Sequence, residues 1–244
     1  MTAKCNHQRE VAILMAAGLG SRMKPLTDKI AKPLVQVRGR PLIETVIAAL
    51  QRRGVDAIYI VVGYKKEQFR PLLAKFPNVQ LIENPEYDIK NNIGSIAVAA
   101  AQMASADCFV CEADLFVPSD QLLCRTLDES GYFGKFLPGH SDDWVFDVED
   151  GRITRVGKGG DNCFNMVGIS YFRQPDAARI ADAVLDAVKN PENAQLFWDE
   201  IVDRLVKDGL SLRIHEVKPC EIVECDTVDE LRRLEESLGA EKSF

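Results

Sequence analysis

A pair of glycines near the start of the chain, Gly18 and Gly20, is followed by a dense run of positive charge. From Arg22 to Arg40 there are six basic residues and one acid, although the formal net charge of the whole chain is −7. Glycines let backbone N–H groups approach a polyanion without interference from a Cβ atom, and basic side chains add charge of the matching sign. The segment therefore predicts a phosphate loop, with a nucleoside triphosphate as its ligand.

Two other kinds of phosphate loop are disfavoured by the residue types present. The dinucleotide fingerprint G-x-G-x-x-G requires a third glycine where this chain has Met23. The Walker loop requires G-x-x-x-x-G-K-[ST], and neither Gly134-Lys135 nor Gly157-Lys158 completes it. An ordinary strand-to-helix turn with solvated charges stays open as an alternative, because a lone glycine pair is a weak signal.

The elements that would position these residues alternate along the first half of the chain. Short apolar runs predict strands at residues 11–15, 55–62, 79–82 and 108–111. The segments between them predict helices at residues 41–53, 66–75 and 95–103. Such alternation indicates an α/β fold with a doubly wound, mainly parallel, Rossmann-like sheet.

Ligands of such sheets bind outside the carboxyl ends of the strands. This rule places the loops after Met15 and Val62, and the acids after Cys111, on one rim. Of these acids, Asp114 is a candidate ligand for a hard divalent cation.

The pattern changes in the second half of the chain. Residues 132–172 form short segments with turn signals at Asp150-Gly151 and Gly159-Gly160, which predict antiparallel strands. Helices are expected at residues 176–189 and 194–207, and a final one after the capping box Thr227-Val-Asp-Glu230. We expect one domain over residues 1–244, with a nucleotide-binding half at 11–131 and an acceptor-binding half at 132–240.

Composition excludes some classes of function. A chain of 244 residues with 46% hydrophobic residues can bury the core of one α/β domain. The sequence pI near 5.1 and the absence of a long basic run disfavour a nucleic-acid partner. The first apolar run is interrupted at Gly18, well before the roughly 20 residues of a membrane span, so no membrane insertion is expected.

The chain has seven cysteines, an odd number, and its polar N-terminus does not resemble a signal peptide, so we expect reduced thiols and a cytoplasmic location. Cys108-x-x-Cys111 is the one pair at a spacing that metal sites use. Residues three apart in a strand point to opposite faces, and no second pair is present. Zinc binding is therefore disfavoured.

The phosphate-loop segment carries a resemblance to a known superfamily. A-A-G-L-G-S-R-M-x-P-L-T, followed by Lys32-Pro33-Leu34, resembles the signature of nucleotidyltransferases that activate sugar phosphates and small phosphorylated alcohols. From Val11 to about Leu238 the chain is most similar to bacterial CTP:phosphocholine cytidylyltransferases and their phosphonate-activating relatives. The supporting segments are N-N-I-G-S at 91–95, E-A-D at 112–114, Trp144 ahead of D-G-R-I, L-F-W-D-E-I-V at 196–202 and E-I-V-E-C-D-T at 221–227.

The resemblance implies roles for particular residues. Arg22 and Lys32 would be the catalytic residues on the triphosphate, and Asp114 and Asp226 would hold Mg²⁺, with Mn²⁺ as an alternative. The nucleotide-binding residues would be Met15, Ala16, Ala17, Gly18, Gly20, Ser21, Asn92, Ser95, Glu112 and Ala113. Three of these residues could instead have purely structural roles. Lys32 would then be a solvated loop lysine, Asn92 a helix cap, and Asp226 an acid favoured by the dipole of the helix that follows.

The acceptor-binding residues that we expect are Trp144, Trp198, Asp199 and Glu224. Trp is the best aromatic partner for a quaternary ammonium. Alternatively, both tryptophans are core residues and the acids lie on a helix surface. Ile93 and Gly94 depart from the phosphocholine pattern, which tends to have aromatic residues there. The resemblance thus implies transfer of CMP from CTP to phosphocholine with release of pyrophosphate, or alternatively to 2-aminoethylphosphonate.

Two further functions and two properties stay open at this point. The functions are a sugar-1-phosphate nucleotidyltransferase and a noncatalytic nucleotide-sensing protein on the same fold. The preference for cytosine over uracil rests on the resemblance alone. The oligomeric state is not determined by the sequence, and a homodimer is one alternative.

Overall fold

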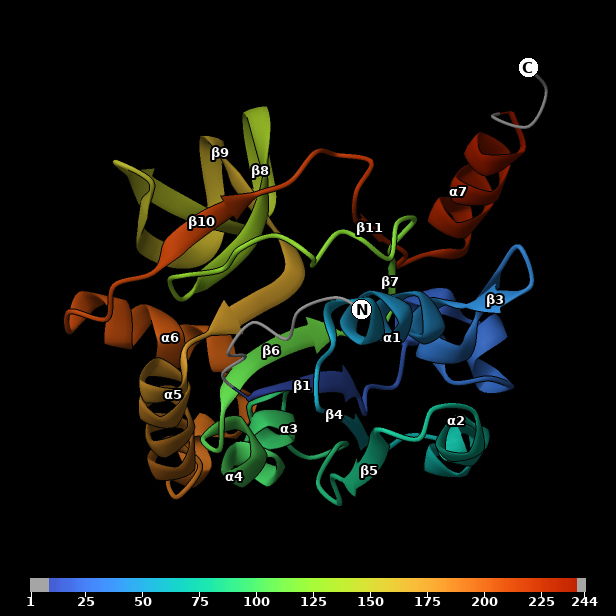
Figure 1. Cartoon of the computed structure of the whole chain (residues 1–244), viewed down its shortest axis with the longest axis horizontal. Coiled ribbons are helices and arrows are strands. Elements are labelled where there is room, and N and C mark those ends of the chain that lie inside the picture. The colour runs from blue at the N-terminus through green and yellow to red at the C-terminus, as the bar shows by residue number, and fades with distance from the viewer. Residues whose placement is uncertain (1–8, 241–244) are drawn as a thin grey trace, which may run out of the picture.

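Seven strands form the central sheet of the computed structural model, which describes residues 9–240 (Figure 1). Their order across the sheet is β10-β8-β9-β6-β1-β4-β5. Their bounds are β1 (Glu10–Ala16), β4 (Ala57–Val62), β5 (Val79–Glu83), β6 (Asp107–Glu112), β8 (Gly131–Glu149), β9 (Arg152–Phe172) and β10 (Arg213–Glu216). Strands from both predicted halves of the chain thus share one sheet.

The direction of the strands confirms the predicted fold class. Strand β1 pairs in parallel with β4 on one side and with β6 on the other, and β4 pairs in parallel with β5. Strand β9 is antiparallel to β6, and β8 is antiparallel to β9. The sheet is therefore mainly parallel in the first half of the chain, with an antiparallel extension from the second.

The antiparallel extension consists of two long strands rather than the short segments that we predicted. Strands β8 and β9 have 19 and 21 residues, and their pairing shifts register repeatedly. The turn between them contains Asp150 and Gly151, both in the left-handed region. Gly159 and Gly160 lie within β9 instead of ending a strand. We call the outer part of this pair, residues 136–165, the arm.

Helices cover both faces of the sheet. The α-helices are α1 (Leu42–Arg53), α2 (Arg70–Lys75), α3 (Ile93–Val98), α4 (Ala100–Met103), α5 (Gln174–Ala187), α6 (Trp198–Lys207) and α7 (Val228–Ala240). The 3₁₀ helices are η1 (Ser21–Met23), η2 (Leu26–Asp28), η3 (Lys32–Leu34), η4 (Lys66–Phe69) and η5 (Pro191–Gln195). None of the helices in the described residues is both long enough and apolar enough to cross a bilayer.

Three predicted helices differ in their bounds. The helix expected at 66–75 is a 3₁₀ turn followed by α2, with Pro71 in the first turn of α2, where a missing N–H costs nothing. The helix expected at 95–103 begins at Ile93 and is interrupted at Ala99. The helix expected from residue 194 begins at Trp198, because Glu200 Oε2 accepts a hydrogen bond from the backbone N–H of Phe197 at 2.8 Å.

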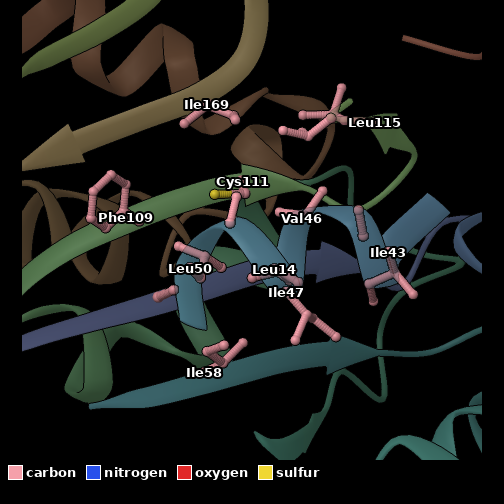
Figure 2. Close-up of a cluster of buried hydrophobic side chains, with 14 of the residues drawn as sticks. Leu14, Ile43, Val46, Ile47, Leu50, Ile58, Phe109, Cys111, Leu115 and Ile169 are labelled. Carbon is pink, nitrogen blue, oxygen red and sulfur yellow. The ribbon is translucent and has the colours of Figure 1, made fainter. Parts of the chain in front are cut away.

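Helix α1 packs against the sheet through its apolar face (Figure 2). Ile43, Val46, Ile47 and Leu50 of this helix are all fully buried, at the helical spacing the sequence predicts. Their neighbours come from four strands: Leu14, Ile58, Phe109, Cys111 and Ile169. This packing holds the parallel strands in register, so the loops at their carboxyl ends have a fixed base.

The opposite face of the sheet is covered by α3, α4, α5 and α6. Cys108 of β6 belongs to this second core, whereas Cys111 belongs to the core under α1. The two thiols therefore point to opposite faces of the strand, as its period of two predicts.

The last helix, α7, packs on the loops that follow β1. Leu231 and Leu234 join a separate apolar cluster with Met23 and Leu42. The predicted capping box is confirmed: Glu230 N–H donates to Thr227 Oγ1 at 3.2 Å, and Thr227 N–H donates to Glu230 Oε2 at 2.9 Å. Just before it, β11 (Val223–Glu224) pairs with β7 (Leu115–Phe116), which brings the C-terminal acids next to those after β6.

Candidate active site

Three adjoining cavities lie at the carboxyl ends of β1 and β6, and Arg22 lines all of them. The loop cavity, of about 380 Å³, is lined by Gly18, Gly20, Ser21, Lys32 and Asp226 among others. The inner cavity, of about 240 Å³, is lined by Met15, Tyr87, Asn92, Ser95 and Glu112 among others. The arm cavity, of about 300 Å³, is lined by Trp144, Lys158, Phe197, Asp199 and Glu224 among others.

The glycine loop is tied closely to the residues beneath it. Gly20 has a φ of 61°, and a Cβ atom there would lie 2.9 Å from the Cβ of Lys32 and 3.0 Å from the Cγ2 of Thr27. Thr27 Oγ1 donates a hydrogen bond to the carbonyl oxygen of Gly20 at 2.9 Å, and Tyr64 Oη donates to the carbonyl of Thr27 at 3.1 Å. Glycine is thus required at position 20 by both conformation and space.

Lys32 lies between two carboxylates that come from distant parts of the chain. Its Nζ is 2.5 Å from Asp114 Oδ2 and 2.5 Å from Asp226 Oδ1. Arg22 Nη1 lies 2.6 Å from the other oxygen of Asp226. With 6% of its surface exposed, Lys32 is buried, so the alternative of a solvated loop lysine is wrong.

The charge of Lys32 is secured by its partners. Burial alone lowers the pKa of the ammonium, but the carboxylates of Asp114 and Asp226 outweigh this effect and raise it above its usual value. Lys32 is therefore a permanent positive charge at the base of the loop cavity.

Two further acids lie beside this centre. Burial raises the pKa of Glu112 well above its usual value, and the nearby Asp114 and Glu224 add to the shift. Loss of hydration at the cavity wall, then Asp114 and Asp226, raise the pKa of the exposed Glu224 to about 8. The second oxygen of Asp114, Oδ1, is buried without a hydrogen-bond partner in the described residues. The carboxyl groups around Lys32 can therefore bind a further cation.

Asp114 and Asp226 fit a hard divalent cation, because both present carboxylate oxygens to one point and Asp114 Oδ1 has no partner among the described residues. Within residues 9–240, no group of three or more His, Cys, Asp or Glu residues could hold a metal ion on its own. Mg²⁺ is commonly bound by one or two carboxylates completed by substrate phosphates and water. A metal that enters with a triphosphate matches this donor set.

Asn92 stands at the N-cap position of α3, but its side chain makes no capping hydrogen bond to that helix. The side chain instead joins the two halves of the chain. Asn92 Oδ1 accepts a hydrogen bond from the backbone N–H of Trp198 at 2.9 Å. Ser95, also in the inner cavity, is buried and its Oγ accepts from Asn84 Nδ2 at 3.2 Å.

The two tryptophans have different surroundings. Trp144 lines the arm cavity, and its ring meets that of Phe197 edge to face at 5.3 Å. Trp198 has 3% of its surface exposed and packs against Tyr132 and Phe172 in the core. Trp198 does not line the arm cavity, so the structure places it beneath the expected acceptor site as a core aromatic.

Asp199 is a buried acid, not a helix-surface one. Four per cent of its surface is exposed, and its Oδ1 accepts a hydrogen bond from Tyr132 Oη at 3.0 Å. Burial raises its pKa to about 7, although the hydrogen bond from Tyr132 opposes the shift. Glu224 lines both the inner and the arm cavity, and so lies between the two predicted substrates.

The structure brings nearly all of the predicted nucleotide-binding residues to these cavities. Those that line the loop or inner cavity are Met15, Ala16, Ala17, Gly18, Gly20, Ser21, Asn92, Ser95 and Glu112. Ala113 is fully buried and lines none of the three.

The residues that line the site and that sequence reasoning missed include Tyr87, Lys90, Asp143, Lys158 and Phe197. Tyr87 and Lys90 follow β5, so the rule that ligands bind beyond the carboxyl ends of strands would have found them. Asp143, Lys158 and Phe197 carry no such signal, because the arm and α6 meet through tertiary contacts alone.

A permanent lysine charge, an arginine and two convergent carboxylates at the mouth of a glycine loop are suited to moving a nucleotidyl group between phosphates. The fold and this site together define a nucleotidyltransferase. The chain belongs to the MobA-like NTP transferase domain family, which it matches over residues 12–242. Nucleotidyltransferases of this kind generally use a divalent metal.

Relatives with assigned names span almost the whole chain. It is 48% identical over 227 residues to the 2-aminoethylphosphonate cytidylyltransferase of Lancefieldella rimae, covering 93% of this chain and 92% of that protein. The solved CTP:phosphocholine cytidylyltransferase of Streptococcus pneumoniae is 32% identical, with a TM-score of 0.87, and the match covers 94% of this chain and 99% of that one. The predicted resemblance to these cytidylyltransferases is confirmed.

A more distant structure shows how widely the fold is shared. The UDP-glucose pyrophosphorylase of Acinetobacter baumanii is 18% identical, with a TM-score of 0.75, and the match covers 96% of this chain and 95% of that one. At this identity the likeness concerns the fold alone, because the same fold supports many acceptors.

Proposed function

We propose that this enzyme transfers CMP from CTP to a small phosphonate or phosphorylated amine, with 2-aminoethylphosphonate as the preferred acceptor. The observation that carries this proposal is the acidic arm cavity, lined by Asp142, Asp143, Asp199 and Glu224. A primary ammonium favours the ionised form of a nearby acid, so when bound it would lower the raised pKa values of Asp199 and Glu224. It would then donate charged hydrogen bonds, the strong class of such bonds, to their carboxylates. The name of the relative that is 48% identical supports the same acceptor.

The proposed reaction is an in-line displacement at the α-phosphorus of CTP. A phosphonate oxygen of the acceptor forms the new P–O bond while the bond to pyrophosphate breaks, and pyrophosphate takes the bonding pair. Arg22 and Lys32 neutralise charge on the triphosphate oxygens, which is most of what such a reaction requires of a protein. Asp114 and Asp226 would hold a divalent ion, which would supply further neutralisation of negative charge when bound.

The inner cavity is the proposed site of the cytidine, with Asn92 and Ser95 facing the base. We also propose that residues 11–131 bind the nucleotide and residues 132–240 bind the acceptor. The cavity linings support this division: most residues of the loop and inner cavities come from the first segment, and most residues of the arm cavity come from the second. CTP itself is supported by the names of the two cytidylyltransferases.

We further propose Mg²⁺ as the physiological ion, with Mn²⁺ as a working substitute, because the donors are carboxylate oxygens.

A cytoplasmic location is supported by the cysteines: six in the described residues are free thiols, typical of a reducing compartment. Light scattering at micromolar concentration tests the homodimer alternative.

Phosphocholine is the second candidate acceptor. The edge-to-face pair of Trp144 and Phe197 in the arm cavity favours it, because aromatic faces bind quaternary ammonium groups. The name of the relative from Streptococcus pneumoniae supports it as well.

Pyrophosphate release across a grid of substrates tests the proposal. CTP, UTP, ATP and GTP are each paired with 2-aminoethylphosphonate, phosphocholine, phosphoethanolamine and glucose-1-phosphate. We expect the highest kcat/KM for CTP with 2-aminoethylphosphonate. A preference for glucose-1-phosphate would identify a sugar-1-phosphate nucleotidyltransferase, and no turnover of any pair in the presence of Mg²⁺ would favour a noncatalytic sensor.

A further inference from the structure

A lysine covers the aromatic pair of the arm cavity. Lys158 Nζ lies 5.7 Å from the ring centroid of Trp144 and 5.0 Å from that of Phe197, within the range of cation–π contacts. In the described part of the chain, this ammonium makes no ion pair with a carboxylate. The rings are therefore already in contact with a cation that belongs to the protein.

The backbone around Lys158 is held in place by Arg155. Arg155 Nη2 donates to the carbonyl oxygen of Gly159 at 2.8 Å, and its Nε is 2.6 Å from Asp147 Oδ2. A Cβ atom at position 157 would lie only 2.6 Å from Arg155 Nη1, so the glycine there allows this close approach. The lysine thus projects from an anchored segment of β9.

Lys158, Trp144 and Phe197 also form a wall between two spaces. The same three residues line the arm cavity and an outer groove of about 600 Å³ between β9 and α6. The outer groove is also lined by Glu192, Leu196, Arg204 and Lys207. An acceptor in the arm cavity would contact these three residues from the side that carries Asp199 and Glu224.

We propose that Lys158 determines which amine the enzyme accepts, by covering the ring faces that a trimethylammonium group would need. This inference rests on the proposed function. A trimethylammonium has no N–H to donate, so it depends on aromatic faces and diffuse charge. A primary ammonium instead donates hydrogen bonds to the carboxylates of the same cavity. Lys158 therefore disfavours phosphocholine and leaves 2-aminoethylphosphonate a complete set of partners.

The test compares the two acceptors on Lys158→Gln, which removes the charge and keeps a side chain of similar reach. The ratio of kcat/KM for 2-aminoethylphosphonate to that for phosphocholine should fall roughly two- to thirtyfold, the factor of one cation–π contact. Lys158→Arg, which keeps a cation over the rings, should retain the wild-type ratio. Lys207→Gln is the matched control, because Lys207 lines the outer groove only.

A second readout does not depend on turnover. The dissociation constants of both acceptors, measured by calorimetry, should shift toward phosphocholine by the same factor in Lys158→Gln, even if chemistry is slowed. An unchanged ratio in both measurements would overturn the role of Lys158. If the wild-type enzyme uses neither amine, the proposed function itself is wrong, and that result is distinct from an unchanged ratio.

Discussion

At the scale of single residues, the site depends on charges that compensate one another. Lys32 is held by two carboxylates and Arg22 by one of the same pair, so each change of charge affects several partners. Removing the lysine leaves two partly buried carboxylates without this cation, which is costly. The role of each residue in catalysis must therefore be separated from its role in folding.

Lys32→Met should lower kcat by about a hundredfold or more, because it removes a charge directed at the transferring group. The methionine preserves most of the volume, so the cavity penalty is small. Arg22→Ala should show a similar loss with little change in stability, because the Arg22 side chain is 68% exposed. Steady-state kinetics of both variants test this, with Lys24→Ala as control, since Lys24 pairs only with Asp28 on the surface. Near-normal turnover in folded Lys32→Met and Arg22→Ala would refute the assignment.

Asp199 should make stability depend on pH. Its folded pKa of about 7 lies above the usual value of 3.8, so the folded state holds a proton that the unfolded chain loses. The stability contributed by the protonated acid is complete below pH 4 and is lost as the pH rises through 7. The loss is on the order of a few kcal/mol. Thermal unfolding across pH 4–8 measures it.

Asp199→Asn is the comparison for that measurement. The amide keeps an oxygen for Tyr132 Oη but has no proton to lose, so this variant should lose less stability than the wild type between pH 4 and pH 7. Parallel stability curves for the two proteins would show that Asp199 ionises normally.

At the scale of elements, the C-terminal helix positions a proposed metal ligand. Glu230 Oε2 accepts hydrogen bonds from the backbone N–H groups of Asp226 and Thr227, each at 2.9 Å. The same helix packs through Leu231 and Leu234 on the cluster that contains Met23 of the loop after β1. Helix α7 therefore braces both sides of the loop cavity.

Glu230→Ala should raise the Mg²⁺ concentration needed for half-maximal activity, because it frees the backbone of Asp226. The loss of a capping interaction costs about 1 kcal/mol of stability, which lowers the melting temperature of a chain of this size by about 2–4 °C. Titration of activity with Mg²⁺, together with thermal unfolding, checks both effects. Glu236→Ala, an exposed acid on the same helix, should change neither.

The elements also show what the sequence can predict. The alternation of strands and helices, the mainly parallel sheet and the capping box of α7 follow from local patterns, because each depends on the period of buried residues or on adjacent polar groups. The burial of Lys32 has no local pattern, because its partners Asp114 and Asp226 are 82 and 194 residues away.

The acceptor side was harder to predict because its details depend on where one helix begins. Helix α6 starts at Trp198, so Phe197 is still extended and its ring reaches the arm cavity, while Trp198 in the first turn faces the core. A helix starting at 194, as we predicted, would change which aromatic ring faces the substrate.

At the scale of the whole molecule, ligand binding and folding are linked. A ligand present at a hundred times its dissociation constant stabilises the folded state by about 2.7 kcal/mol, or about 5–10 °C in melting temperature for a chain of this size. CTP with Mg²⁺ should produce such a shift. Asp114→Asn should lose most of the dependence on Mg²⁺ while keeping a smaller response to CTP alone.

Thermal unfolding with CTP, with and without a chelator, measures this linkage in both proteins. The wild type should show a larger shift when Mg²⁺ is present, and activity in a chelator should vanish. Equal shifts and full activity in the chelator would remove the metal from the proposal.

Strands β8 and β9 have one further consequence. Their inner ends carry Tyr132 and Phe172 in the core, and their outer ends carry Trp144 and Lys158 at the arm cavity. Each strand therefore contributes both to the core and to the lining of the arm cavity. An engineer seeking new acceptors can vary the arm residues that line the cavity, such as Trp144 and Lys158, because the ladder at the base of the arm keeps the strands in register while the nucleotide loop is left untouched. Phe146 and Val156 of the arm belong to the core and must be kept.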